Sequence, residues 1–204
     1  MHHRSTVMRF LVRLANRSGA SAADRKQLAK TAYETVRSFG ADVGNLRVSN
    51  AAVEFDLLLD SETKLGDSLK AIEGKIGPLL TLRKLDVQSP PIEKAEAIRS
   101  GLGLFDEERY WESHEALESA WKEAEGDEKE ILQGLILIAA SLVHWQKNEK
   151  QVTLSVMKRA RDKLGRHQTE YSGIDIVALT NRLDGILSAN IPEFFKLTAV
   201  NKDL

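Results

Sequence analysis

Two consecutive prolines, Pro90 and Pro91, divide this chain of 204 residues into parts with different hydrophobic patterns. Neither proline carries a backbone N–H group, so neither a helix nor a central strand can continue through them. Before the prolines, strand-like and helix-like periodicities alternate, whereas after them the periodicity is helical throughout. We therefore expect two domains, residues 1–88 and 93–204, joined by a proline-rich linker at 89–92.

The two parts carry opposite net charges. Lys and Arg outnumber Asp and Glu by 14 to 10 before the linker, and the acids lead by 20 to 15 after it, so the halves of +4 and −5 sum to −1. The chain contains no cysteine. This excludes disulfides, iron–sulfur clusters, cysteine nucleophiles and cysteine-ligated zinc, and any metal ion would need His and carboxylate ligands.

Nothing in the hydrophobic pattern predicts a membrane protein. The most apolar stretch, residues 131–143, is shorter than the roughly 20 residues that a membrane-spanning helix needs. Arg9 and Arg13 interrupt the apolar run near the start of the chain, which is not typical of a signal peptide. We expect a cytoplasmic protein with no membrane contact.

The first domain is predicted to fold as strand, helix, strand, strand, helix, strand. The strands are expected at residues 7–15, 46–48, 53–59 and 79–87, where apolar and polar residues alternate. One helix is expected to begin after Ser21 and end at Gly40, and the other to begin near Leu65 and end at Gly77-Pro78. This βαββαβ order is that of the ferredoxin-like fold, in which two helices cover one face of the sheet, and the whole chain is then α+β.

The other face of this sheet bears on RNA binding, because RNA-recognition sheets stack bases on exposed aromatic side chains. Here the corresponding positions hold no aromatic residue; they are Arg9, Leu11, Arg13, Glu54, Asp56 and Leu58. Opposite charges on neighbouring strands are expected to form cross-strand ion pairs. We keep RNA as a candidate partner of the basic first domain, and favour a docking or dimerisation surface that would give a homo-oligomer.

The second domain carries its polar residues on the helix expected at 107–124. At about 100° per residue, His114 lies on the side that faces the core, together with Tyr110 and Trp121. Glu118 follows His114 by one turn, and Trp111 and Glu115 flank the pair. An imidazole and two carboxylates therefore border the apolar face. Glu112 and Glu123 fall on the opposite side and are expected to be solvated.

The next helix, expected at 127–147, is the most apolar and should form the centre of the bundle. Its polar exceptions, Gln133 and His144, are three turns apart on one stripe. If this stripe faces the preceding helix, a polar pocket forms from His114, Glu115, Glu118, Gln133 and His144, with Trp111, Trp121 and Trp145 as walls. Polar groups that converge in an apolar pocket are the default hypothesis for a binding or active site.

Three interpretations of this pocket stay open. His114, Glu118 and His144 could bind a divalent zinc, iron or manganese ion, with Glu115 as general base for a metal-bound water. Without a metal, Glu115 or Glu118 would act as base and His114 or His144 as acid in a hydrolytic step, or the pocket would bind a small cationic or hydrogen-bonding ligand. In the third interpretation, the polar network only fixes how the helices pack. The protein is then a non-catalytic interaction protein whose first domain binds RNA or a protein partner.

The patterns of the remaining segments predict helices that pack against the rest of the bundle. A basic run at 158–166 is expected to form a solvated face. Residues 171–176 predict a turn followed by a helix N-cap.

The succession of motifs in the second domain resembles the helical family called domain of unknown function three hundred and nine. The matching motifs are Leu104-Phe105, Tyr110-Trp111-Glu112, His114-Glu115, Leu117-Glu118, Trp121, Gln133-Gly134-Leu135-Ile136, Ala139-Ala140, His144, Tyr171 and Gly173-Ile174-Asp175. The resemblance covers about residues 93–190. It implies a compact all-helical domain in which the His-Glu-x-x-Glu helix faces the Gln-Gly-Leu-Ile helix, and it implies no established activity. The chain departs from the family pattern at Asn148, where glycine-containing dipeptides are expected.

Overall fold

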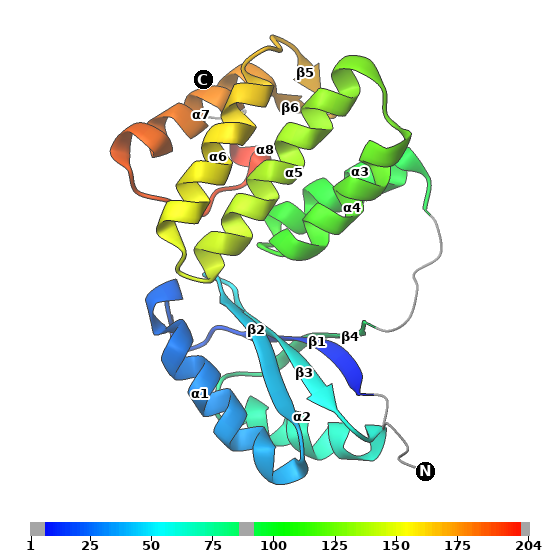
Figure 1. The fold of residues 1–204 in the computed structure, drawn as a ribbon, viewed down its shortest axis with the longest axis vertical. Helices are drawn as coiled ribbons and strands as arrows, with labels where there is room; N and C mark the ends of the chain where they lie inside the picture. The colour runs from blue at the N-terminus through cyan, green and yellow to red at the C-terminus, as the bar shows by residue number, and fades with distance from the viewer. Residues whose placement is uncertain (1–6, 86–91, 201–204) are drawn as a thin grey trace, which may run out of the picture. The chain divides into compact units, whose positions relative to one another are not determined.

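The computed structural model describes residues 7–85 and 92–200. The chain divides into two compact units, residues 1–90 and 91–204 (Figure 1). The first unit holds a four-stranded sheet with helices, and the second is mainly helical, so the α+β class is confirmed. Most of the predicted linker, residues 89–91, lies outside the described residues.

The first unit has the predicted βαββαβ order. Its elements are β1 (Met8–Ala15), α1 (Arg25–Val36), β2 (Asp42–Val48), β3 (Ala52–Leu59), α2 (Leu65–Glu73) and β4 (Leu79–Lys84). The strands are arranged in the order β2-β3-β1-β4, and every neighbouring pair is antiparallel. This is the sheet of a ferredoxin-like fold. Strand β4 ends at Lys84, whereas the prediction extends it to residue 87. Residues 86 and 87 lie outside the described residues.

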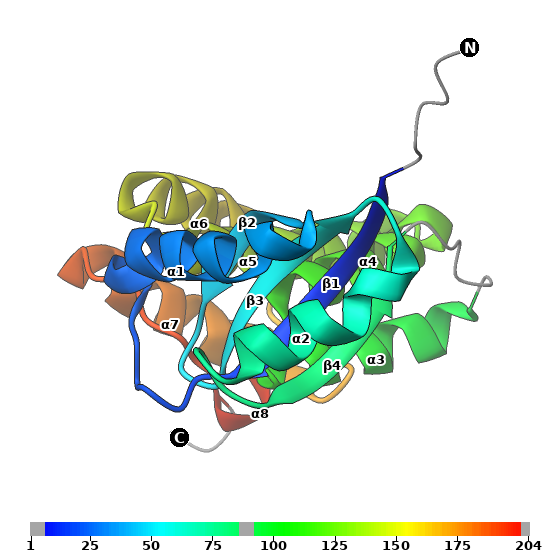
Figure 2. The same cartoon turned by 90° about the horizontal axis from the view of Figure 1, so that it is seen from below.

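The core of this unit lies between the sheet and both helices, which cover the same face (Figure 2). Alternate residues of β1 and β3 point into it, among them Phe10, Val12 and Phe55, and they pack against Val36 of α1 and Ile72 of α2. The period of two therefore separates the residues that face this core from those on the other face of the sheet, although Leu11, Glu54 and Asp56 on that other face are also buried.

The opposite face of the sheet carries the predicted cross-strand ion pairs. The register places Arg13 opposite Glu54 and Leu11 opposite Asp56, so these residues share one face. Arg9 Nη2 lies 2.6 Å from Asp56 Oδ2, and Arg47 Nη2 of β2 lies 2.8 Å from Glu54 Oε1. The acidic side chains thus neutralise part of the arginine charge on this face.

The strand β2 begins four residues earlier than predicted. Its pairing with β3 shifts register between Gly44 and Arg47, and Asn45 adopts a left-handed conformation with φ of 51°. This bulge breaks the alternation of apolar and polar residues, which is why the sequence pattern detects only the end of the strand.

The second unit is built from five long helices and a short C-terminal one, within residues 92–200. They are α3 (Lys94–Asp106), α4 (Tyr110–Glu123), α5 (Gly126–Gln146), α6 (Lys150–Leu164), α7 (Ile176–Ala189) and α8 (Leu197–Val200). The long apolar helix α5 lies between α4 and α6 and contributes many side chains to a single core (Figure 1). None of the helices in the described ranges is long and apolar enough to cross a membrane.

Close packing of α5 on α6 depends on a glycine and an asparagine. A Cβ atom on Gly134 would lie 2.5 Å from Leu164 Cγ, so only glycine allows this approach. Asn148 adopts the left-handed conformation, with φ of 61°, in the turn that joins the two helices. Asparagine tolerates this conformation better than most residues, so it replaces the glycine expected from the family pattern.

The second unit is helical, as predicted, apart from one short hairpin that the periodicity does not predict. Between α6 and α7 lies a hairpin of two-residue strands, β5 (Glu170–Tyr171) and β6 (Ile174–Asp175). Its turn residues, Ser172 and Gly173, have φ of 49° and 81°, as two-residue hairpin turns require. The predicted N-cap is confirmed, because the Asp175 carboxylate accepts hydrogen bonds from the backbone N–H groups of Val177 and Ala178.

Candidate functional site on helix α4

Helix α4 has one fully buried face and one half-buried edge. Tyr110, Ser113 and Leu117 point into the core, and the Ser113 hydroxyl donates a hydrogen bond of 2.8 Å to the carbonyl oxygen of Gly101 on α3. The edge beside this face is half-buried and holds four predicted site residues: Trp111, His114, Glu118 and Trp121. Glu115 lies further round the helix and is exposed.

His114 and Glu118 form the centre of this edge. They are separated by one helical turn and lie on the same side of α4, where both side chains are half-buried. Within residues 7–85 and 92–198, neither side chain has a hydrogen-bond or ion-pair partner. Polar groups that are partly removed from water are normally satisfied inside a protein. An unpartnered imidazole and carboxylate side by side therefore mark this edge as a place where a ligand can bind.

Trp121 continues the same edge one turn after Glu118. Its indole Nε1 is buried and has no hydrogen-bond partner among the described residues. The ammonium of Lys129 on α5 lies 4.7 Å from the centre of the indole ring, a cation–π contact. The ring thus packs against the core of the bundle and also presents a face that accommodates a cation.

The predicted residues of α5 lie at different heights along α4. The two helices are antiparallel because only residues 124 and 125 join them, and Lys129 contacts Trp121 at one end of the pair. At the other end, the Gln146 amide donates a hydrogen bond of 3.0 Å to the carbonyl oxygen of Glu108. Gln133 therefore lies near the Trp121 end and His144 near the Glu108 end, about 16 Å apart along the helix. These residues share a stripe but do not converge on one point.

His144 is also already paired. Its Nδ1 atom lies 2.5 Å from Glu149 Oε2 across the turn between α5 and α6. In the described parts of the chain, no three His, Asp or Glu side chains are grouped closely enough to hold one metal ion. The predicted ligand set of His114, Glu118 and His144 is therefore not assembled, since its members lie at separate heights and one has another partner.

Glu112 is buried, which corrects the prediction that it is solvated. Only 7% of the residue is exposed. Both of its carboxylate oxygens accept hydrogen bonds from Arg109, at 2.7 and 2.8 Å. The hydrogen bonds from Arg109 to Glu112 raise the pKa of this guanidinium above its usual range. Glu123 is exposed, as predicted.

The sequence predicts Tyr110 and Tyr171 only as packing or family-motif residues, yet both occupy distinctive environments. The Tyr110 ring is fully buried against Phe105 and Phe194, and its hydroxyl has no hydrogen-bond partner within the described ranges. Burial, together with the charges of Glu108 and Asp106, raises the pKa of the Tyr110 phenol. No sequence signal separates such a tyrosine from an ordinary core aromatic residue.

Tyr171 belongs to a cluster with Glu128 and Lys94, drawn from three separate elements. Its hydroxyl donates a hydrogen bond of 3.1 Å to Glu128 Oε1, while Lys94 Nζ lies 2.8 Å from Glu128 Oε2. Burial, followed by this contact with Glu128, raises the pKa of the phenol, and the hydrogen bond from Lys94 lowers the pKa of the Glu128 carboxyl. Each polar group of the cluster therefore has a hydrogen-bond partner within it.

The basic run at 158–166 is partly paired rather than simply solvated. Arg161 forms a bidentate contact with Asp184, with both distances 2.7 Å. Lys163 and Arg166 lie 3.4 and 3.6 Å from the carboxylate of Glu130. These pairs tie α6 to its neighbours α7 and α5.

Comparison with known proteins bears on the same helices. No curated protein matches the chain. Residues 98–156 match the model of a family described as Domain of unknown function (DUF309). The matched stretch runs from α3 into α6 and includes His114, Glu118 and Trp121. Residues 98–156, within the C-terminal half, are therefore similar to this family, and the resemblance is confirmed there; the motifs at Tyr171 and at 173–175 lie beyond the matched stretch.

Proposed function

We propose that the helical unit binds a small organic cation, with Glu118 and His114 making the polar contacts. The observation that carries this proposal is that both side chains are half-buried, one turn apart, and without a partner among the described residues. A carboxylate that is partly withdrawn from water is stabilised by a cation close to it. The neighbouring imidazole can donate or accept a second hydrogen bond.

Charge and aromatic surface support a cationic ligand. The sequence after the linker has a net charge of −5, from 15 basic and 20 acidic residues, which attracts cations. Trp121 already accommodates the ammonium of Lys129 on its ring, and aromatic faces attract organic ammonium groups. An amine with a short aliphatic chain fits both the carboxylate and the tryptophan.

Acid–base chemistry on a bound ligand would use the same two side chains. Glu118 is the better base because it is half-buried next to His114, whereas Glu115 is exposed. His114 would then hold or supply the proton. A divalent metal ion is the other cation that a His and a Glu one turn apart can bind, and the experiment below separates it from an amine.

The test is a titration of the full chain with putrescine, followed by two-dimensional ¹H–¹⁵N NMR. The chain has three tryptophans, so three indole signals report on Trp111, Trp121 and Trp145. We expect a saturable shift of the Trp121 indole signal in the wild type. Glu118→Gln should weaken the affinity by about tenfold or more, because a charge-assisted hydrogen bond is lost. The matched control is Glu123→Gln, which removes an equal charge from an exposed position of the same helix and should bind like the wild type.

Three results would contradict the proposal. One is the absence of a saturable shift with putrescine. A second is equal weakening by both substitutions, which would mean that only the overall negative charge matters. A third is that ZnCl₂ shifts the Trp121 signal in the wild type but not in His114→Ala, while Glu118→Gln binds putrescine as the wild type does, which would make the site a metal site.

A further inference from the structure

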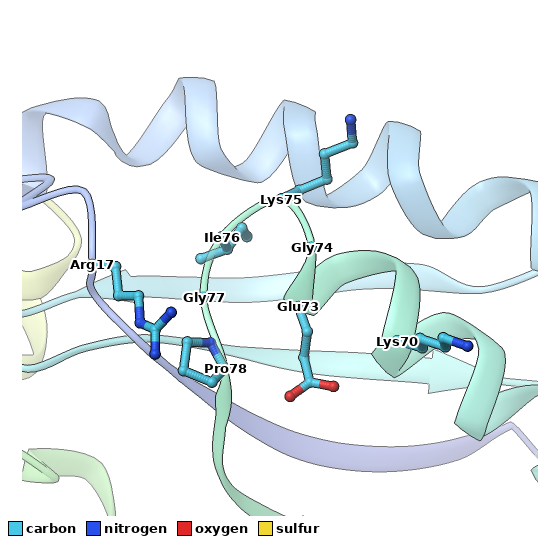
Figure 3. A pocket seen from close by; sticks show the side chains of 8 residues that line it. All are labelled: Arg17, Lys70, Glu73, Gly74, Lys75, Ile76, Gly77 and Pro78. Atoms are coloured by element: carbon cyan, nitrogen blue, oxygen red, sulfur yellow. The ribbon is translucent and has the colours of Figure 1, made fainter.

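The first unit contains a hollow of about 500 Å³ at one end of its sheet, separate from the helical unit (Figure 3). Its walls come from the loop after β1, the end of α2 and the turn that leads into β4. The lining residues that matter are Arg17, Lys70, Glu73, Lys75, Gly77 and Pro78. Figure 3 shows Arg17 and Glu73 on either side of the Gly77-Pro78 turn, with the Lys70 and Lys75 side chains pointing away from Arg17.

The turn at the bottom of the hollow is fixed against β1. A Cβ atom on Gly77 would lie 2.1 Å from the carbonyl oxygen of Ala15, so no other residue allows this contact. The backbone N–H of Ala15 donates a hydrogen bond of 2.9 Å to the carbonyl oxygen of Pro78. Backbone contacts therefore fix the turn that lines the hollow, whereas the side chains of Arg17, Lys70 and Lys75 are exposed.

The loop that carries Arg17 is braced by its neighbour Asn16. The Asn16 amide donates hydrogen bonds to the carbonyl oxygens of Ser49 and Ala20, at 2.8 and 2.7 Å, and its side-chain oxygen accepts one from the Ala20 N–H. The backbone of Arg17 is thus held in place beside the hollow before any ligand arrives. Such preorganisation lowers the entropic cost of binding.

The hollow has an excess of positive charge. Three cations, Arg17, Lys70 and Lys75, line it against one carboxylate, Glu73. That carboxylate accepts a hydrogen bond of 2.6 Å from the backbone N–H of Leu79, which anchors it to β4. Within the described ranges 7–85 and 92–198, the three cations have no ion-pair partner. Elsewhere in this unit, by contrast, Lys64 lies 2.9 Å from an acidic residue of its own helix turn, Asp60.

We propose that this hollow binds a phosphate-bearing small molecule. Its volume is in the range of small-molecule sites, roughly 300–1,000 Å³, and exceeds what a lone phosphate would fill. The planar guanidinium of Arg17 can bind two phosphate oxygens at once, and the two lysines add point charges at the rim. The ligand therefore carries one or more phosphates and a larger organic group.

The test is isothermal titration of the full chain with ADP, and with adenosine as the ligand that lacks phosphates. We expect ADP to bind and adenosine not to bind. Arg17→Ala and the double variant Lys70→Ala/Lys75→Ala should each weaken ADP binding by about tenfold or more. Lys26→Ala is the matched control, because Lys26 is an exposed cation on α1 outside the hollow, and it should change the affinity less than twofold.

The proposal is overturned if ADP does not bind to the wild type, or if Lys26→Ala weakens ADP binding as much as Arg17→Ala. Binding of adenosine as tight as that of ADP would show that phosphate is not recognised. Binding of a single-stranded RNA, but not of ADP, would replace the small molecule by a nucleic acid. Because Arg17, Lys70 and Lys75 are exposed, their variants should melt at the temperature of the wild type, so a loss of binding is not a loss of folding.

Discussion

At the scale of single residues, the polar side chains of the helical unit form two groups, those that pair with one another and those that have no partner among the described residues. Arg109 with Glu112, and Lys94 with Glu128 and Tyr171, satisfy one another. His114 and Glu118 on the edge of α4 do not, because no residue of the described ranges pairs with either of them. Paired groups stabilise the fold, whereas unpaired ones are costly unless a ligand completes them.

The two tyrosines provide a direct test of this distinction. Tyr110→Phe removes a buried hydroxyl without a partner, so the free energy of unfolding should stay the same or rise by up to about 1 kcal/mol. Tyr171→Phe removes the hydrogen bond to Glu128 and should lower the free energy of unfolding by about 1 kcal/mol. Urea unfolding of both variants measures the difference. A larger loss for Tyr110→Phe than for Tyr171→Phe would mean that the Tyr110 hydroxyl has an unseen partner.

The sequence predicts which helix carries the polar edge, but not which of its residues are paired. Helical periodicity alone places His114, Glu118 and Trp121 on one side of α4. It misses the burial of Glu112, because the partner Arg109 precedes the helix and lies off any apolar stripe. It also misplaces His144, whose contact with Glu149 depends on the tight turn at Asn148.

At the scale of elements, most helices and strands follow from the two hydrophobic periods. The long strands β1 and β3 place Phe10, Val12, Leu14, Val53, Phe55 and Leu57 on the core face at every second position, and the prediction of these strands is confirmed. The exceptions have local causes. The bulge at Gly44 and Asn45 hides the first half of β2, and the strands β5 and β6 are two residues long, too short for any periodicity.

Helix packing yields a second prediction, from two glycines. Gly134→Ala would push a methyl group into Leu164, which is fully buried and cannot move away, so we expect a loss of about 1–3 kcal/mol in stability. Gly103→Ala on α3 meets open space and should raise stability by up to about 1 kcal/mol, because alanine favours a helix. Thermal or urea unfolding of the two variants should show opposite signs. A neutral Gly134→Ala would contradict the close packing of α5 on α6.

At the scale of the whole molecule, the chain contains two hydrophobic cores that share no residue. The sequence predicts this division from the change of periodicity at Pro90 and Pro91 and from the opposite charges of the halves. A domain with a core of its own should fold alone.

We therefore expect the fragment 92–204 to fold without the first unit. Its far-UV circular dichroism should be strongly helical, and its thermal unfolding should be a single cooperative transition. The variant Leu132→Ala of the same fragment serves as a control, because truncating this buried core side chain should lower the transition temperature. An unfolded wild-type fragment would show that the helical unit depends on the rest of the chain.

We expect the Glu118 carboxylate to contact a ligand, whereas the Glu112 carboxylate stabilises the fold through its contact with Arg109. The most direct measurement is the free energy of unfolding at pH 7 of three single variants in which a glutamate of α4 is replaced by alanine. We expect Glu112→Ala to lose about 2–3 kcal/mol, because the half-buried Arg109 loses its bidentate partner and keeps only the exposed carboxylate of Glu107. Glu118→Ala and the exposed control Glu123→Ala should remain within about 0.5 kcal/mol of the wild type. If Glu118→Ala loses as much as Glu112→Ala, Glu118 stabilises the fold and the proposed binding site is contradicted.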